Sequence, residues 1–350
     1  MIMSKTNNLT VLLCLNGDKE PAKIMLDRQG ALLRHALDEV NVNYVFSTNQ
    51  DYDIVHLISY NQYKAYKKYR ENDIKRGIPL VFSAFTEMLQ VSDETEEGKL
   101  KNNKEKGLRP ILKKIVKKYN KIDTDQVVFQ DEKQERVSKA LDIFSCPQKT
   151  IKLGARNYPR ENYSPEELGA FRKYFCLSPD RKIIISYGSY EHSENLDILE
   201  TIARIMPEYT FFFFGNKPSL LPRARKNKIA NLFYEGPLPE QLYHSCLLST
   251  EALFIPYKYH CDVSIILEAM KARVPIISTS NFLLENLLID GKTAIITDSV
   301  KGIFTTISNI SKVNYVDQAE EFASQYTSKS YGEELKNLYF EVLKRNVNKK

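Results

Sequence analysis

The sequence lacks the features that mark membrane-spanning and disulfide-rich proteins. No apolar run in its 350 residues approaches the roughly 18 residues that a membrane-spanning helix requires. The apolar run at residues 10–17 is short, and no small-residue cleavage site follows it. We therefore expect the first strand of a cytoplasmic protein there, rather than a signal peptide. The five cysteines are odd in number and form no C-x-x-C pair. They argue against a disulfide framework or a zinc site and favour free, buried thiols.

The composition is that of a globular protein. Hydrophobic residues make up 43% of the chain and charged residues 27%, and the formal net charge is +6. This charge is modest for the length, and no aromatic platform is interleaved with the lysines, so nucleic-acid binding is not expected. A chain of 350 residues is expected to form two domains.

Strand-like and helix-like segments alternate in both halves, which predicts α/β domains with parallel sheets covered on both faces. Predicted strands lie at residues 10–17, 43–47, 53–59, 78–85, 126–130, 149–154, 181–189, 209–215, 231–236, 251–257, 274–279 and 293–298. Predicted helices lie at residues 23–40, 62–77, 108–122, 135–143, 195–206, 239–249, 263–273 and 330–345. A polar, proline-marked stretch at 155–167 is the predicted linker. The predicted domains are 1–155 and 156–328, both Rossmann-like, and 329–350 is a closing helix that packs toward the N-terminal domain.

Two segments carry a motif. EALFIPY at 251–257 is followed by SIILEAMKARVPIIST at 264–279, and DYDIVHLIS stands at 51–59. In these residues and in the order of its elements, the chain resembles the family 4 retaining glycosyltransferases. Within that family it is most similar to bacterial enzymes that glycosylate diacylglycerol or its glycosides. The resemblance implies the GT-B fold, in which two Rossmann-like domains face a cleft. It also implies transfer of a hexose from a nucleotide sugar to an acceptor hydroxyl, with retention.

The family motif E-x(7)-E supplies the hypotheses for the donor site. The resemblance implies that its second glutamate, here Glu268, accepts hydrogen bonds from the ribose hydroxyls. The first glutamate contacts the hexose, and its place is taken by His260, with Asp262 as the nearest carboxylate. The start of the helix at 263–273 is expected to point N–H groups at the diphosphate. The other donor-binding positions are Ile266, Leu267, Gly188 and Ser189. The alternative interpretation of Glu268 is an exposed helix glutamate.

Four further positions depart from the family. Arg273 stands where the family motif has a glycine after LEAM. Phe85 stands where the family has a histidine near the sugar, and Ser189 and Glu194 stand where it has an arginine and a lysine. Cations at that place promote transfer because they neutralise the charge that grows on the leaving diphosphate. Substitute cations are present on loops expected near the cleft: His192, Lys217, Arg223, Arg225 and Lys226. The more ordinary interpretation of each is a solvated surface charge.

No metal and no cofactor are expected besides the nucleotide-sugar substrate, such as a UDP-hexose. Metal-dependent sugar transferases need an acidic D-x-D element after a strand, and none follows a predicted strand here. The expected acceptor is a lipid or a cell-envelope glycan.

Residues 108–122, LRPILKKIVKKYNKI, are predicted to form a basic amphipathic helix. One face carries Ile111, Leu112, Ile115, Val116 and Tyr119, and the other carries Lys113, Lys114, Lys117, Lys118 and Lys121. Such a helix can lie in an anionic membrane surface, where each lysine contributes about 1 kcal/mol. That interpretation predicts a protein peripheral on the inner face of the cell membrane. The other interpretation is a surface helix that packs its apolar stripe on the domain core.

Two functions are compatible with these features. One is the active glycosyltransferase. The other is a catalytically inactive GT-B-like partner or scaffold of an active glycosyltransferase, because several motif positions in separate segments have changed chemistry together.

Overall fold

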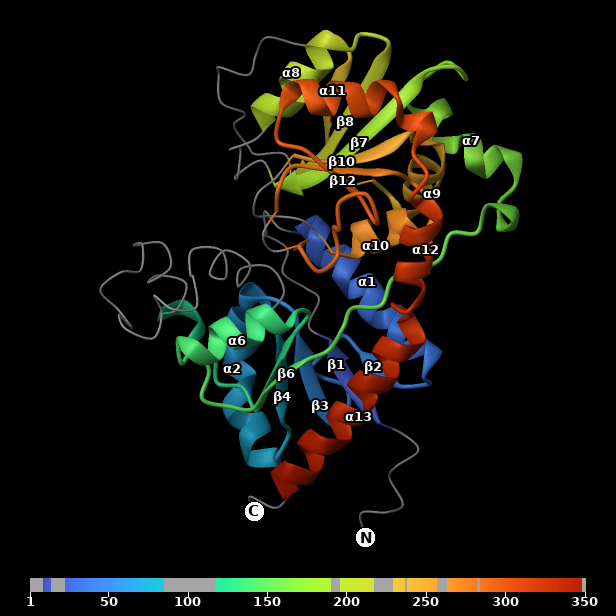
Figure 1. Ribbon diagram of the computed structural model, residues 1–350. Coiled ribbons are helices and arrows are strands. Elements are labelled where there is room, and N and C mark those ends of the chain that lie inside the picture. The colour runs from blue at the N-terminus through green and yellow to red at the C-terminus, as the bar shows by residue number, and fades with distance from the viewer. Residues whose placement is uncertain are drawn as a thin grey trace. The chain divides into compact units, whose positions relative to one another are not determined.

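The chain folds into two compact units, which are described separately. The computed structural model describes residues 9–13, 23–84, 117–189, 196–216, 229–236, 238–256, 263–281 and 284–347. The first unit comprises Met1–Gly154 together with Tyr326–Lys350, and the second comprises Ala155–Gln325. Figure 1 shows a parallel sheet with helices packed around it in each unit.

The first unit is built on a six-stranded parallel sheet with the order β2-β1-β3-β4-β5-β6. Its strands are β1 (Thr10–Leu13), β2 (Asn43–Val45), β3 (Ile54–Leu57), β4 (Leu80–Ser83), β5 (Gln126–Phe129) and β6 (Gln148–Thr150). Its helices are α1 (Lys23–Glu39), α2 (Tyr60–Arg76), α6 (Glu132–Ala140) and α13 (Ser328–Val347). Every residue of β3, β4 and β5 is buried, as in parallel sheets covered on both faces. The predicted α/β class is confirmed for this unit.

Local sequence signals set the ends of α2. The Ser59 hydroxyl accepts a hydrogen bond from the backbone N–H of Gln62 at the helix start. Gly77 ends the helix with a φ of 75°, in the left-handed region that glycine adopts at no steric cost. The helix therefore stops where the predicted one does.

The C-terminal helix α13 packs on the first unit, beside α1 (Figure 1). Gly332 makes this packing possible, because a Cβ at that position would lie 2.1 Å from the carbonyl oxygen of Ala36. Tyr331, Leu335 and Tyr339 of α13 are buried in the same unit.

The second unit has a second six-stranded parallel sheet, with the order β12-β11-β10-β7-β8-β9. Its strands are β7 (Lys182–Ser189), β8 (Tyr209–Asn216), β9 (Leu232–Glu235), β10 (Ala252–Ile255), β11 (Ile276–Ser278) and β12 (Ile295–Ile296). Its helices are α7 (Pro165–Tyr174), α8 (Leu196–Ile205), α9 (Glu240–Ser249), α10 (Val263–Lys271), α11 (Val300–Ser308) and α12 (Val316–Ser324). Four consecutive phenylalanines of β8, residues 211–214, are fully buried, so both faces of this strand lie in the core.

The predicted linker at 155–167 is partly wrong, because α7 begins inside it. The Ser164 hydroxyl accepts from the Glu167 N–H, and the Glu167 carboxylate accepts from the Ser164 N–H, while Pro165 occupies the first helical turn. This capping box and proline are helix-start signals. They override the polar, loop-like composition of the stretch.

Two further helices of the second unit, besides α7, have no counterpart among the predictions. Helix α11 has the sequence VKGIFTTIS, whose β-branched residues and glycine have low helix propensity. Its Ser299 N-cap accepts from the Gly302 N–H, and Ile303 and Ile307 are buried. Helix α12 is equally short and buries only alanines. Across the described ranges, no helix combines the length and the apolar character needed to cross a membrane.

Candidate functional site

The strand order of the second unit changes direction at β7, which has β10 on one side and β8 on the other. Open parallel sheets bind ligands at such a switch point, outside the carboxyl ends of the strands. Strand β7 ends at Ser189, and β10 ends at Ile255. Helix α10 follows β10, so its N-terminus lies at this edge of the sheet and directs backbone N–H groups there.

Two glycines bring the carboxyl ends of β7 and β8 close together. Gly188 and Gly215 are partners in the strand register. A Cβ at Gly215 would lie 2.3 Å from the carbonyl oxygen of Gly188, so a side chain cannot be added without moving a strand. The predicted donor-binding residue Gly188 is only partly buried. Its backbone is therefore accessible at the ligand-binding edge.

Glu268, the predicted ribose-binding residue, lies in the middle of α10 and is only 1% exposed. The Tyr243 hydroxyl of α9 donates to Glu268 Oε2 over 2.7 Å. The Tyr158 hydroxyl donates to Glu268 Oε1 over 3.4 Å. A buried carboxyl group is costly unless it is hydrogen-bonded, and the two tyrosines provide that compensation. The alternative of an exposed helix glutamate is therefore wrong.

Lys271 lies one helical turn after Glu268. Its Nζ donates to the carbonyl oxygen of Ala155 over 2.8 Å. Burial lowers the pKa of Lys271 to about 8, although the charge of Glu268 acts in the opposite direction. Glu268 and Lys271 together hold the start of the second unit, Ala155–Tyr158, against α10.

Aromatic rings support the glutamate from the sheet side. The Tyr243 ring packs edge-to-face against Tyr158 and Tyr187, each with a centroid distance of 5.9 Å. Tyr187 lies beside Gly188 in β7, and its ring is 5.0 Å from that of Phe214 in β8. The sequence did not single out Tyr158 or Tyr243, because each contacts Glu268 across a long separation in the chain that no local spacing reveals.

Of the other predicted donor-site residues, some lie within the described part of the chain and the rest lie outside it. Ile266 and Leu267 are fully buried in the apolar core, so their side chains anchor α10. Ser189 ends β7. The following lie outside the described residues: Phe85, His192, Glu194, Lys217, Arg223, Arg225, Lys226, His260 and Asp262. Among the side chains that the structure does describe, no group of three or more histidines, cysteines, aspartates and glutamates is placed to hold a metal ion.

In the first unit, His56 of β3 is a buried packing residue. Its Nε2 lies 2.7 Å from Ser83 Oγ of β4, and its Nδ1 lies 2.6 Å from the Tyr339 hydroxyl of α13. Burial lowers the pKa of His56 to about 3, so the ring is neutral in the folded protein at physiological pH. Its hydrogen bonds tie α13 to the sheet.

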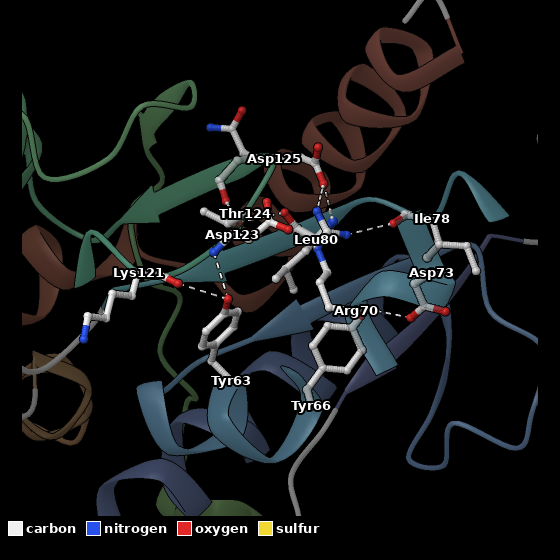
Figure 2. A network of polar contacts seen from close by, with 11 residues as sticks. Tyr63, Tyr66, Arg70, Asp73, Ile78, Leu80, Lys121, Asp123, Thr124 and Asp125 are labelled. Atoms are coloured by element: carbon white, nitrogen blue, oxygen red, sulfur yellow. Dashed lines mark hydrogen bonds and ion pairs between the residues drawn. The ribbon is translucent and has the colours of Figure 1, made fainter. Parts of the chain in front are cut away.

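A second polar network lies at the amino ends of β4 and β5, the edge of the sheet opposite to the one where parallel sheets bind ligands (Figure 2). Arg70 of α2 pairs with Asp125 over 2.8 Å and with Asp123 over 3.3 Å. Asp125 also accepts from the Leu80 N–H. Burial opposes the charge of Arg70, but the two carboxylates outweigh it and raise its pKa. The D-x-D sequence at 123–125 is thus engaged in joining α2 to the sheet.

Part of the basic segment at 108–122 lies within the described residues. Lys117–Tyr119 are helical, and Lys117 is exposed. The Nζ of Lys118 lies over the Tyr60 ring, 4.5 Å from the ring centroid. The Tyr119 ring is buried among the aromatic residues Phe82 and Phe144. This end of the predicted apolar stripe therefore packs on the core of the first unit. Ile111, Lys113, Lys114 and Ile115 lie outside the described residues.

Solved structures share the architecture of both units. Sucrose-phosphate synthase of Thermosynechococcus elongatus matches with a TM-score of 0.66 and 11% identity, over 97% of this chain and 100% of that one. HepE of Anabaena, solved in complex with UDP-glucose, matches with a TM-score of 0.63 and 13% identity, over 95% of this chain and 99% of that one. WaaG, a glycosyltransferase involved in lipopolysaccharide biosynthesis, matches with a TM-score of 0.64 and 11% identity, over 95% of this chain and 99% of that one. The protein has the GT-B fold. No protein-family model matches the sequence of this protein.

Among curated proteins, this GT-B chain is similar to the processive diacylglycerol alpha-glucosyltransferase of Acholeplasma laidlawii. The two are 26% identical over 205 residues, which is 55% of this chain and 59% of the relative. The matched part thus spans less than two thirds of the relative's length. The predicted resemblance to GT-B glycosyltransferases, including one that acts on diacylglycerol, is confirmed.

Proposed function

We propose that the protein is a glycosyltransferase that moves a hexose from a nucleotide sugar to a lipid hydroxyl. The observation that carries this proposal is the placement of Glu268, a tyrosine-held carboxyl group in the helix that starts at the ligand-binding edge of the second unit. The similarity to a diacylglycerol glucosyltransferase supports the donor and acceptor classes. The UDP-glucose complex of a protein with the same fold supports UDP-glucose as the donor to test first.

In the proposed donor complex, the ribose hydroxyls donate to Glu268, and the first N–H groups of α10 face the diphosphate. Gly188 and Ser189 border the diphosphate from β7. Asp262 or His260 contacts the hexose. Lys217 and Arg223 are the proposed cations that neutralise the leaving diphosphate, in place of the family's usual pair. The proposed transfer retains the anomeric configuration and requires no metal.

The proposed acceptor is reached at an anionic membrane surface on the cytoplasmic side. The membrane-facing residues are Ile111, Lys113, Lys114, Ile115, Lys117 and Lys118, and the exposure of Lys117 is compatible with that role. The test is vesicle flotation with and without an anionic lipid. Binding that depends on the anionic lipid and falls when Lys113, Lys114 and Lys117 are changed to glutamine supports the proposal. Binding independent of these lysines contradicts it.

The catalytic proposal is tested by incubating the purified chain with UDP-glucose and diacylglycerol in anionic vesicles. We expect a lipid α-glucoside, identified by the coupling constant of its anomeric proton, and the same rate in the presence of a chelator. Glu268→Gln is expected to lower the rate, and Glu285→Gln, which changes an exposed glutamate of the same unit, is the matched control. A chain that binds UDP-glucose but transfers nothing, alone or with any acceptor lipid, supports the inactive-partner alternative instead.

A further inference from the structure

Glu268 has two tyrosine partners of unequal strength. Tyr243 donates to Oε2 over 2.7 Å, which is the usual length of a strong O–H···O hydrogen bond. Tyr158 donates to Oε1 over 3.4 Å, near the outer limit for such a bond. A competing hydroxyl group can therefore replace Tyr158 at Oε1 at much lower cost than it can replace Tyr243 at Oε2.

The two tyrosines also differ in how firmly the fold holds them. Tyr243 lies within helix α9, is 3% exposed and packs between the rings of Tyr158 and Tyr187. Tyr158 lies in an irregular segment just before the short 3-10 helix Arg160–Asn162, and it is 8% exposed. Tyr243 is therefore held within a regular helix, whereas Tyr158 lies in a segment without regular secondary structure.

We propose that Tyr243 positions Glu268 for the donor ribose and that Tyr158 is an exchangeable cap that the ribose displaces from Oε1. This inference rests on the proposed function, because it presumes that a nucleotide binds at Glu268. Tyr243 keeps its bond when the ribose binds, so the carboxylate plane stays fixed for the incoming hydroxyls. Tyr158 limits access to Glu268 until a ribose hydroxyl takes its place.

The proposal predicts opposite effects of two equivalent substitutions. Tyr243→Phe removes the support, so the dissociation constant of UDP should rise about tenfold, the factor that corresponds to one hydrogen bond to a charged group. Tyr158→Phe removes the hydroxyl that competes with the ribose, so the dissociation constant of UDP should fall severalfold. Tyr234→Phe is the matched control, because the Tyr234 hydroxyl also donates to a glutamate, Glu200 Oε1, over 2.7 Å but on β9. It should leave UDP binding unchanged.

The experiment is isothermal titration of the full chain and these variants with UDP and with 2′,3′-dideoxy-UDP. The ratio of the two dissociation constants reports the contribution of the ribose hydroxyls, which a merely structural role of Tyr243 would not change. We expect this ratio to shrink in Tyr243→Phe and to be kept or enlarged in Tyr158→Phe. Equal ratios in all variants, while the wild-type chain binds UDP, overturn the inference and leave the proposed function standing. A wild-type chain that binds neither nucleotide overturns both.

Discussion

Arg273 takes a conformation that side chains disfavour, with a φ of 59°, two residues after the end of α10. The family resemblance places a glycine at this position, and the left-handed backbone explains why glycine suits it. Arginine is retained here with ion pairs to Asp317 and Glu320 of α12. At this position the chain therefore has a backbone conformation that disfavours a side chain, together with ion pairs to α12 that a glycine could not make.

A comparison of two truncations isolates the free-energy cost of the left-handed backbone conformation at Arg273. Both Arg273→Gly and Arg273→Ala remove the ion pairs, but only alanine keeps the Cβ that the left-handed region disfavours. We expect the folding equilibrium constant of the glycine variant to exceed that of the alanine variant about fivefold to thirtyfold. Urea unfolding of the two variants measures it. The exposed Lys301 inside α11 is the control, where alanine should be the more stable of the two. Glycine and alanine of equal stability at 273 would contradict the strain argument.

His56 predicts a dependence of stability on pH. Its pKa is lowered to about 3 in the folded protein, from an ordinary value of 6.5. The unfolded chain therefore binds a proton between these values that the folded chain does not. His56 contributes its full stability above pH 6.5 and loses it as the pH falls toward 3. The free energy of unfolding should lose about 1.4 kcal/mol per pH unit from this group once the pH is well below 6.5.

Urea unfolding at several pH values between 6.5 and 5 checks this dependence. In His56→Gln, the free energy of unfolding should change less steeply with pH, because the contribution of His56 is removed. His35→Gln, which changes a histidine whose side chain is 41% exposed, is the matched control. An unchanged slope in His56→Gln would show that the buried ring does not titrate as the structure implies.

At the scale of elements, the packing of α13 on α1 depends on a glycine. Gly332→Ala would place a Cβ 2.1 Å from a backbone oxygen of α1, so the helices must separate. We expect a loss of about 1–3 kcal/mol in the free energy of unfolding, typical of overpacking. The control is Gly169→Ala in α7, where a Cβ meets nothing within 4 Å. That variant should gain about 0.4–1 kcal/mol. Denaturant unfolding distinguishes the two signs, and equal effects would contradict the packing of α13.

The Arg70 network joins α2 to β4 and β5. Arg70→Met leaves Asp125 without its cation at a site where the arginine side chain is 6% exposed. We expect a cost of about 1–3 kcal/mol in the free energy of unfolding, because a partly buried carboxylate and the carbonyl oxygen of Ile78 lose a charged donor. Lys75→Met, on an exposed position of the same helix, should cost little. If both variants unfold at the same denaturant concentration, the network does not stabilise the unit.

The sequence predicts elements best where periodicity and end signals agree. Helix α2 has a serine at its start, a glycine at its end and the buried residues Tyr63 and Tyr66 about one turn apart between them. Helix α7 was missed because its capping box stands in a polar stretch, and α11 because its residues have low helix propensity. The burial of Ile303 and Ile307 stabilises α11, and that packing depends on tertiary structure.

At the scale of the whole molecule, the alternation of strands and helices was enough to predict two parallel sheets, and the family resemblance implied the GT-B fold. The candidate site was only partly predictable. Glu268 is found by its motif, LEAM, but its hydrogen bonds to Tyr158 and Tyr243 join segments that lie far apart in the chain. No spacing rule brings such residues together before the fold is known.

The central claim is that the second unit binds a nucleotide sugar through Glu268. Isothermal titration with UDP-glucose tests it most directly, on the wild-type chain, on Glu268→Gln, which keeps the size of the side chain, and on Glu285→Gln as the exposed control. The account predicts saturable binding by the wild type and the control, and a dissociation constant at least about tenfold higher for Glu268→Gln. Absent binding by the wild type, or equal binding by all three proteins, would contradict it.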